Sequence, residues 1–368
     1  IFSYVGQWSY SIYVWHWPLV VLGFYFDLVN WWIYGVPLSI LLGFLSYEFI
    51  EKLKFTRYSS WREIYKVKPL YIFLIIFGCV YTIQKMDGFT SRLPDSVKIA
   101  QNEIENSNPY NCKKNELYEC IIGNKNNIKA IIIGDSHADS LTTSLASIFN
   151  LKSQGIISLT TSSCPLIADI RFYSERNICS QINEKRFKLI NLKKYENIPI
   201  ILAARYSNYL IGENDPDRMS TNDSKPLIYF GNNPNLSSEN RFILFDKNLK
   251  NTLCKISKRN PTYIIQPIPE LGFNAPKRII KNEFYNSNKE TSISYRDYLR
   301  RSEKTRKIIN RSAVDCNVKV LDPSKILCKT GKCISEYKGR PIYRDGDHLS
   351  EYGNKLLKPM FKEVIEKY

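Results

Sequence analysis

The stretch IIIGDSHADS, residues 131–140, decides how this chain folds, because an apolar, β-branched run ends in Gly-Asp-Ser-His and passes into a helix-forming segment. The run IKAIIIG, residues 128–134, predicts a short strand that stops at Gly134, and SLTTSLASIFN, residues 140–150, has apolar residues at helical spacing. Gly134 permits a tight turn between them. The sequence therefore predicts a strand, a turn and a helix, with Ser136 at the turn.

The chain after this unit continues to alternate between strands and helices. GIISLTT, residues 155–161, predicts a second strand, and residues 352–368 predict a last helix. Three segments each predict a helix followed by a strand: residues 185–209, 251–270 and 296–323. This alternation predicts an α/β fold with a parallel sheet and helices on both faces, and ligands bind such sheets beyond the carboxyl ends of the strands, where Ser136 falls. Residues 213–240, rich in Asn, Asp, Ser and Pro, predict an insertion that serves as a lid or substrate rim.

The first 50 residues have the composition of a membrane segment, with no Lys or Arg and only two acids. Two apolar stretches, one from residue 1 and one from Trp31, are each about 20 residues long, enough to cross a bilayer. A third stretch begins at Pro69 and is about 15 residues long, close to a buried core helix, but we predict it as a span. The sequence thus predicts about three transmembrane helices.

The loop of residues 51–68 sets the expected orientation, because it holds six Lys or Arg against two Glu and is predicted to be cytoplasmic. We therefore predict transmembrane helices over residues 1–86, a periplasmic linker over residues 87–127 and a soluble domain over residues 128–368. The chain begins with Ile inside an apolar segment, so we expect it to be the C-terminal part of a longer membrane protein.

Cysteine usage agrees with export, since eight of the nine cysteines follow residue 86 and the other, Cys79, lies in the third apolar stretch. An even set without zinc-type spacing predicts disulfides. We pair cysteines that are close along the chain. The remaining pair, Cys254 with Cys316, is the least certain prediction. The predicted pairs are Cys112 with Cys120, Cys164 with Cys179, Cys328 with Cys333, and Cys254 with Cys316.

The formal net charge of +17 lies mainly on the exported part of the chain. A basic extracytoplasmic domain is more suited to anionic glycans or lipid headgroups than to nucleic acid. A solvated, Lys-rich surface without a specific partner is the alternative.

Ser136 is a candidate nucleophile only if a base can take its proton, and the chain holds three histidines: His16, His137 and His348. His348 closes the sequence RDGDHLS, with Asp345 three residues before it. An imidazole can take the hydroxyl proton, and a carboxylate can fix the ring's tautomer and support its charge. We therefore predict Ser136, His348 and Asp345 as catalytic residues. The alternative is that Gly-Asp-Ser merely caps a helix.

Two neighbours compete for these roles. His137 is adjacent to Ser136, which makes a hydrogen bond between the two side chains awkward, so we interpret it as a structural or pocket-lining residue. Asp347 is adjacent to His348, whereas the three-residue spacing of Asp345 lets its carboxylate fold back toward the ring.

The early GDSH and the late Asp-x-x-His resemble the first and last sequence blocks of the SGNH hydrolase superfamily, over residues 128–368. The resemblance implies a flavodoxin-like α/β/α domain with a Ser nucleophile, a His base and an orienting Asp. The superfamily's second block has an oxyanion Gly, where this chain has TTSSCPL, leaving Ser162 or Ser163 as stand-ins. Its third block is Gly-x-Asn, where this chain has Arg205, which could bind the oxyanion or substrate by charge. The candidate oxyanion or substrate residues are thus Ser163, Arg205 and His137.

The apolar segment YSIYVWHWPL, residues 10–19, is similar to a signature of the acyltransferase-3 membrane family, and SYEFIEK, residues 46–52, resembles the end of that family's next helix. By itself, His16 would be a packed histidine. SCPL, AARYSNY, PIPELG and LCKTGKC look like features of SGNH domains fused to such proteins. Fused proteins of this type resemble bacterial O-acetylases of lipopolysaccharide O-antigen and other surface glycans, in the inner membrane with the SGNH domain in the periplasm.

The resemblance implies an O-acyltransferase, with acetyl-CoA as the acyl donor to the full-length protein and a surface glycan as acceptor. Membrane lipid and the N-terminal membrane half of the same protein are the other expected partners. No cofactor, metal or nucleic acid is expected for this part of the chain. The alternatives are a carbohydrate acetyl esterase with the same triad, in which water replaces the sugar hydroxyl, and a non-catalytic glycan-binding domain.

Overall fold

The computed structural model describes residues 2–26, 28, 30–52, 60–62, 68–110, 112, 119–174, 178–215 and 225–365. They belong to two compact units, Ile1–Leu93 and Pro94–Tyr368, which are described separately.

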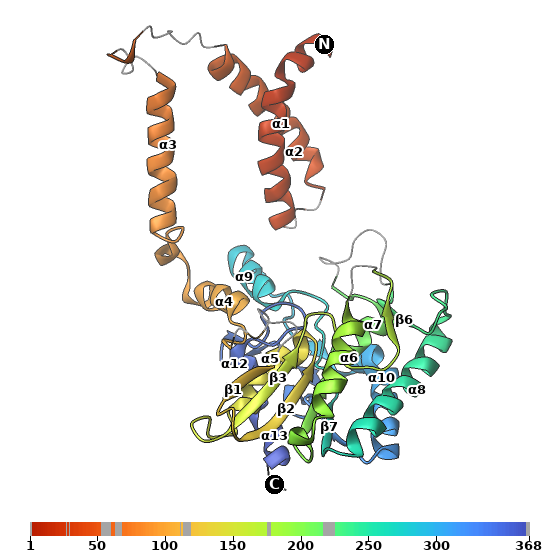
Figure 1. Cartoon of the computed structure of the whole chain (residues 1–368). Coiled ribbons are helices and arrows are strands. Elements are labelled where there is room, and N and C mark those ends of the chain that lie inside the picture. Colours follow the sequence, from red (N-terminus) through yellow and green to blue (C-terminus); the bar gives the residue numbers. More distant parts are fainter. Residues whose placement is uncertain are drawn as a thin grey trace. The chain divides into compact units, whose positions relative to one another are not determined.

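The first unit is helical. Its elements are α1 (Phe2–Tyr25), α2 (Trp32–Ser46), the π-helical turn Tyr47–Glu51 and α3 (Lys68–Lys85) (Figure 1). Gly43 of α2 packs so closely on α1 that a Cβ there would lie 2.8 Å from the backbone of Ile12. Small residues allow such close approach between apolar helices.

The prediction of three membrane spans is only partly matched. Of the helices in the described part of the chain, Trp32–Glu51 alone is long and apolar enough to cross a bilayer, and Leu70–Lys85 is apolar but shorter. The first predicted span corresponds to α1, where polar residues such as Gln7 and His16 interrupt the apolar sequence. The basic loop of residues 51–68 lies largely outside the described residues.

The second unit is built on a six-stranded sheet in the order β1-β3-β2-β5-β7-β9. Strands β3, β2, β5, β7 and β9 run parallel, and β1 pairs antiparallel with β3 at one edge. The strands are β1 (Cys120–Gly123), β2 (Ile128–Gly134), β3 (Gly155–Thr160), β5 (Ile200–Ala203), β7 (Thr262–Ile265) and β9 (Lys319–Leu321). The parallel strands, numbered along the chain, follow the 2-1-3-4-5 order of flavodoxin-like sheets.

Strand β1 departs from the expected all-parallel sheet and lies inside the segment of residues 87–127 that was predicted as a linker. The strand is only four residues long, too short for its pattern to stand out in the sequence. Its disulfide partner Cys112 and the preceding helix α4 (Asp95–Glu105) also belong to the second unit. The sheet therefore begins before residue 128.

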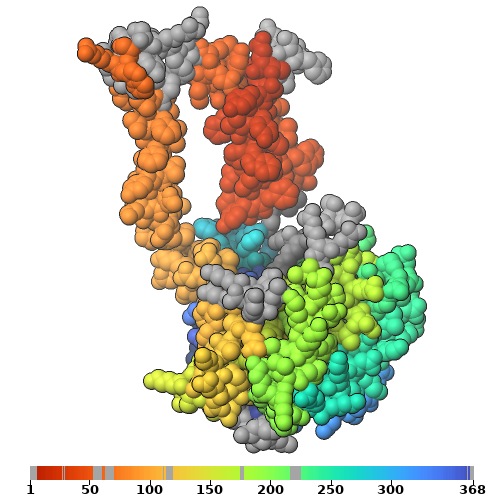
Figure 2. Space-filling view, viewed as in Figure 1, coloured from red at the N-terminus to blue at the C-terminus, as the bar shows by residue number. Residues whose placement is uncertain are grey.

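Helices cover both faces of the sheet because successive side chains of a strand point to opposite sides. On one side Ile131 and Ile133 of β2 belong to a core with side chains of α8 and α10, and on the other Ile132 belongs to a core with side chains of α5 and α13. Besides α4, the α-helices in the described part of this unit are α5 (Ser136–Ala146), α6 (Cys179–Ile190), α7 (Tyr206–Ile211), α8 (Ser238–Ser257), α9 (Ala275–Tyr285), α10 (Tyr295–Asp315), α11 (Ser324–Leu327), α12 (Glu351–Leu356) and α13 (Lys358–Ile365). The space-filling view shows α6 and α8, in green and teal, at the surface of the second unit (Figure 2).

The segment of residues 213–240, predicted as an insertion, contributes a strand. β6 (Ile228–Phe230) pairs antiparallel with β4 (Ile170–Phe172), and α8 begins at Ser238. Residues 216–224 of this segment lie outside the described residues. The lid function stays a prediction.

All four predicted disulfides are confirmed: Cys112–Cys120, Cys164–Cys179, Cys254–Cys316 and Cys328–Cys333. Cys254–Cys316, the pair predicted with the least support, joins α8 to the C-terminal cap of α10. These elements are neighbours in space although 62 positions separate the cysteines. The Cys328–Cys333 bridge closes the hairpin of β10 (Cys328–Lys329) and β11 (Lys332–Cys333), beside β8 (Ile293–Ser294). A last hairpin, β12 (Glu336–Tyr337) and β13 (Arg340–Pro341), precedes the segment that carries His348.

Candidate active site

The turn between β2 and α5 places Ser136 at the first position of a helix. Gly134 is required here because a Cβ would lie 1.7 Å from the carbonyl oxygen of Ala203 on β5, and its φ of +156° is one that residues with a side chain rarely adopt. Asp135 is the helix cap, since its Oδ1 accepts a hydrogen bond from the backbone N–H of His137 at 2.8 Å. The capping interpretation of the motif thus applies to Asp135 and leaves the Ser136 hydroxyl available.

Asp135 also connects this turn to the segment that follows β5. Its Oδ2 accepts from the backbone N–H of Arg205 at 2.9 Å and from the hydroxyl of Tyr209 at 2.7 Å. Both oxygens of this buried carboxylate are therefore used within the protein. The result is a fixed orientation for the start of α5 and for Ser136.

The structure brings the three predicted catalytic residues together. Ser136 Oγ lies 2.7 Å from His348 Nε2, and His348 Nδ1 lies 2.8 Å from Asp345 Oδ2. The other oxygen of Asp345 accepts from the backbone N–H groups of His348 and Asp347, at 2.8 and 3.0 Å. Asp345 thus folds back onto its own loop, as the three-residue spacing predicted, and orients the ring toward Ser136.

The loop that carries His348 is held by backbone hydrogen bonds. Leu271 donates its N–H to the carbonyl of Gly346 at 2.8 Å, and Ala275 donates to that of Asp345 at 3.2 Å. Gly346 fits tightly here, because a Cβ would lie 3.0 Å from the carbonyl oxygen of Phe273. These contacts dock the loop onto the segment between β7 and α9, a link between distant residues.

The surroundings of His348 favour its protonated form. Burial alone would lower the pKa of this imidazole, but the hydrogen bond to Asp345 and the negative charges of Asp347 and Asp345 outweigh it and raise the pKa above its usual value. A base with a raised pKa accepts the hydroxyl proton more readily, and the carboxylates stabilise the imidazolium that results.

Asp347 also reaches His348, at a longer distance than Asp345. Its Oδ2 lies 3.3 Å from His348 Nδ1, 3.1 Å from His137 Nε2 and 3.3 Å from Arg205 Nε. The ring of His137 is buried and meets the ring of His348 edge-to-face at 5.2 Å between centroids. His137 therefore lies beside the triad and faces Asp347 through Nε2, consistent with a structural residue.

Arg205, predicted as an oxyanion or substrate residue, lies among carboxylates of the protein. Its guanidinium pairs with both carboxylate oxygens of Glu213, at 2.6 and 2.8 Å, and with Glu270 Oε2 at 2.7 and 3.0 Å. The side chain is 9% exposed. These donors are engaged by carboxylates of the protein, so Arg205 supports Asp347 here, and its role toward an oxyanion or substrate stays a prediction.

Ser163 lies in the loop that follows β3, with its backbone in the left-handed region at φ 55°. That loop is joined to the nucleophile turn, because Thr161 N–H and Arg186 Nη2 both donate to the carbonyl of Gly134, at 3.0 and 2.9 Å. Arg186 also donates to the carbonyl of Cys164 at 2.9 Å. The exposed Ser163 thus sits on a loop anchored at the turn, and its role as an oxyanion donor stays a prediction.

The arrangement suits acyl chemistry on a serine. His348 can take the Ser136 proton, and the backbone N–H of Ser136, at the first position of α5, can face a developing oxyanion. His137, Asp347 and His348 also present potential ligand atoms within 4.8 Å of one another. We assign them to the hydrogen-bond network, because the guanidinium of Arg205 beside the same Asp347 oxygen would repel a cation.

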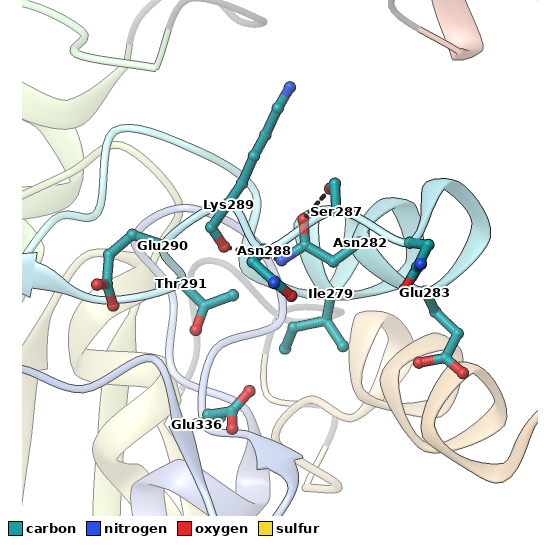
Figure 3. Close-up of a pocket in the computed structure, with 10 residues that line it drawn as sticks. Ile279, Asn282, Glu283, Ser287, Asn288, Lys289, Glu290, Thr291 and Glu336 are labelled. Atoms are coloured by element: carbon teal, nitrogen blue, oxygen red, sulfur yellow. Dashed lines mark hydrogen bonds between the residues drawn. The ribbon is translucent and has the colours of Figure 1, made fainter.

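A surface pocket of about 480 Å³ lies apart from this chemistry (Figure 3). It is lined by residues of α9, the loop that follows it and β12, such as Asn282, Lys289 and Glu336. None of its lining residues belongs to the triad or to the Arg205 network.

Sequence reasoning missed the support for the triad, although the signal was present. Arg205 and Tyr209 belong to the motif AARYSNY, and Glu270 belongs to PIPELG. From sequence, both motifs are interpreted as features of fused SGNH domains and Arg205 as a candidate ligand residue, without a carboxylate partner assigned to it. Their charged residues meet one another, since Glu270 also pairs with Arg301 at 2.8 Å. An unexplained Arg or Glu in such an apolar stretch is the signal that could have identified the network, because buried charges need partners.

A family model described as SGNH domain (fused to AT3 domains) matches residues 105–363. No curated protein sequence matches the chain. The chain is similar to the solved periplasmic domain of a lipopolysaccharide acetyltransferase from Salmonella ser. Paratyphi A, with 18% identity, a TM-score of 0.49, and coverage of 75% of this chain and 98% of that one. A candidate SGNH hydrolase from Slackia heliotrinireducens has 11% identity, a TM-score of 0.33, and coverage of 65% and 99%. A candidate lipase from Chitinophaga pinensis DSM 2588 has 13% identity, a TM-score of 0.32, and coverage of 65% and 97%.

Proposed function

The chain belongs to the family of SGNH domains that are fused to AT3 domains, and on this premise we propose that it is an O-acyltransferase acting on a bacterial surface polysaccharide such as lipopolysaccharide O-antigen, with acetyl as the acyl group. The observation that carries the proposal is the 2.7 Å contact between Ser136 Oγ and His348 Nε2, with Asp345 on the other ring nitrogen. This is the geometry that a serine needs to become a nucleophile at neutral pH.

The proposed reaction has two halves that use the same base. His348 Nε2 takes the hydroxyl proton as Ser136 Oγ attacks the carbonyl carbon of the acyl donor, and the imidazolium then gives that proton to the leaving group, which departs from an acyl-serine ester. In the second half His348 takes a proton from a sugar hydroxyl, whose oxygen attacks the acyl carbon. The sugar ester forms, and the proton returns to Ser136 Oγ.

The acyl donor at the start of the pathway is proposed to be acetyl-CoA on the cytoplasmic side, with the acyl group carried across the bilayer by the membrane part of the protein. The backbone N–H of Ser136 stabilises the oxyanion in both halves, and Ser163 is the further donor we propose from the neighbouring loop.

We propose that the protein is a multi-pass inner-membrane protein with residues 94–368 in the periplasm. Four disulfides in the second unit support an oxidising compartment. The apolar helix Trp32–Glu51 supports a membrane anchor. On α3, exposed apolar side chains such as Phe73 and Ile75 also suit a lipid environment.

The test is acetylation of the surface glycan in cells that carry the full-length protein or its Ser136→Ala variant, compared by glycan analysis. The matched control is Ser147→Ala, which removes a hydroxyl from the C-terminal end of the same helix, where it donates to the local carbonyl of Ser144. We expect acetylation to fall to background in Ser136→Ala and to stay at the wild-type level in Ser147→Ala.

Two other outcomes would assign a different function. Acetylation that is unchanged in Ser136→Ala would leave a non-catalytic glycan-binding domain, and increased acetylation would indicate an esterase that uses the same triad with water as acceptor. Hydrolysis of a chromogenic acetyl ester by the purified full-length chain, lost in Ser136→Ala, would show a competent nucleophile in either enzyme.

A further inference from the structure

His348 Nδ1 lies within hydrogen-bonding or ion-pairing distance of two carboxylates. Asp345 Oδ2 is 2.8 Å away and Asp347 Oδ2 is 3.3 Å away. One N–H can be shared between two acceptors in a three-centre bond. The imidazole that faces Ser136 therefore has a near acidic partner and a second one slightly farther off.

The second carboxylate is the more deeply buried of the two. The side chain of Asp347 is 1% exposed, against 16% for that of Asp345. Burial alone would raise the pKa of Asp347, but the hydrogen bond with His137 and the positive charges around it lower the pKa. The carboxylate is therefore ionised at neutral pH and stands beside His348 as a negative charge screened little by solvent.

The proton of His137 can be placed by elimination. Its Nε2 faces Asp347 at 3.1 Å, while its buried Nδ1 has no hydrogen-bond partner among the residues that the structure describes. A proton on Nδ1 would be a buried donor without an acceptor, which is costly. The geometry therefore places a proton on Nε2, which His137 donates to Asp347.

Arg205 completes the setting of Asp347, with Nε 3.3 Å from the same oxygen. Glu213 and Glu270 also pair with its guanidinium, and Arg301 pairs with Glu270 in turn. The glutamates share the positive charge of Arg205, so that Asp347 remains an effective negative charge toward His348. Arg344 is another cation near the imidazole ring of His348, with its Nε 4.0 Å from Asp345 Oδ2.

We propose that Asp347 is a second carboxylate partner of His348 in the acyl-transfer cycle, and that His137 and Arg205 are positioning residues that hold it there. This inference rests on the proposed function for its catalytic consequence. It implies that the imidazolium formed when Ser136 loses its proton is stabilised by two acids, and that either acid retains part of the function when the other is removed.

The first experiment compares the full-length chain with Asp345→Ala, Asp347→Ala and the double variant in hydrolysis of a chromogenic acetyl ester. Removing the single triad acid of a serine protease lowers kcat by about 10⁴-fold. Here we expect each single variant to lose about 10²-fold in kcat/KM and the double variant about 10⁴-fold. A double variant no slower than Asp345→Ala would overturn the proposal.

The second experiment uses the isosteric Asp347→Asn, in case the alanine variant does not fold. An anion a few ångströms from an imidazole raises its pKa by about one unit or more. Asp347→Asn should therefore move the acidic limb of the kcat/KM profile to lower pH by about one unit. The control Asp322→Asn removes a carboxylate that pairs with Arg306 instead, and should leave the limb in place. If folded Asp347→Asn keeps the acidic limb at the same pH as the wild type, the proposal is contradicted.

The third measurement does not depend on activity. The chain has only three histidines, so the ring signals of His348 in ¹⁵N-histidine-labelled protein can be assigned with His16→Gln and His137→Gln variants. The pKa of His348 read from these signals should fall in Asp347→Asn by about one unit, as in the kinetic profile. If Ser136→Ala leaves glycan acetylation unchanged while this shift is seen, the proposed function fails and the carboxylate pair stands.

Discussion

Replacement of Arg205 by lysine separates the role that the structure gives this residue from the role predicted from sequence. Lysine keeps the positive charge that an oxyanion or substrate would need. It cannot reproduce the planar fork that contacts Glu213 through both oxygens and also reaches Glu270 and Asp347. We therefore expect Arg205→Lys to destabilise the second unit.

The magnitude follows from the contacts that are lost. Lysine can replace one of the carboxylate contacts and loses the others, and each hydrogen bond to a charged group contributes about 1.5 to 3 kcal/mol. Because Arg301 still pairs with Glu270, the loss stays below the full effect of an unpaired buried charge. We expect a loss of about 3 kcal/mol, which lowers the melting temperature by roughly 6 to 10 °C.

The assay has to report the second unit. All six tryptophans lie at or before residue 61, so tryptophan fluorescence reports only the first unit. Thermal unfolding followed by near-ultraviolet circular dichroism of tyrosine, or by calorimetry, is suitable. Arg171→Lys, at the exposed position of β4, is the matched control and should leave the melting temperature unchanged. Wild-type stability in Arg205→Lys, together with a raised KM for the ester, would refute the structural role and restore the role in ligand binding.

Three further predictions follow from the same geometry. Gly134→Ala would place a Cβ against the carbonyl of Ala203, so we expect a loss of about 3 kcal/mol or more, and a thermal melt equal to wild type would contradict this. Because the pKa of His348 is raised and only its neutral form can act as base, activity should fall as pH drops and be half-maximal above pH 6.5; a midpoint below that value in kcat/KM profiles is the opposing result. The double variant Cys254→Ser/Cys316→Ser opens a loop of 62 positions and should lose about 4 kcal/mol by chain entropy, measured by denaturant unfolding against the oxidised wild type.

Local sequence was sufficient for the parts of the molecule that form through near neighbours. The strand over residues 128–134 and the helix at Ser136 follow from periodicity and one glycine. The contact between Asp345 and His348 spans three residues, and three of the four disulfides join cysteines 15 or fewer positions apart. In each case the partners are held close by the chain itself, whatever the rest of the fold does.

The remaining features needed the tertiary structure. Ser136 and His348 are 212 positions apart, and only the docking of the His348 loop beyond the ends of the strands brings them to 2.7 Å. The sequence marked Arg205 as a candidate site residue but did not show its partners, and the fold surrounds it with Glu213, Glu270 and Asp347. The partner of a buried charge is chosen by residues far away in sequence, because desolvation penalises any arrangement in which that charge is left alone. The amino-acid order therefore determined which groups could do the chemistry, and the packing of distant segments decided which of them meet.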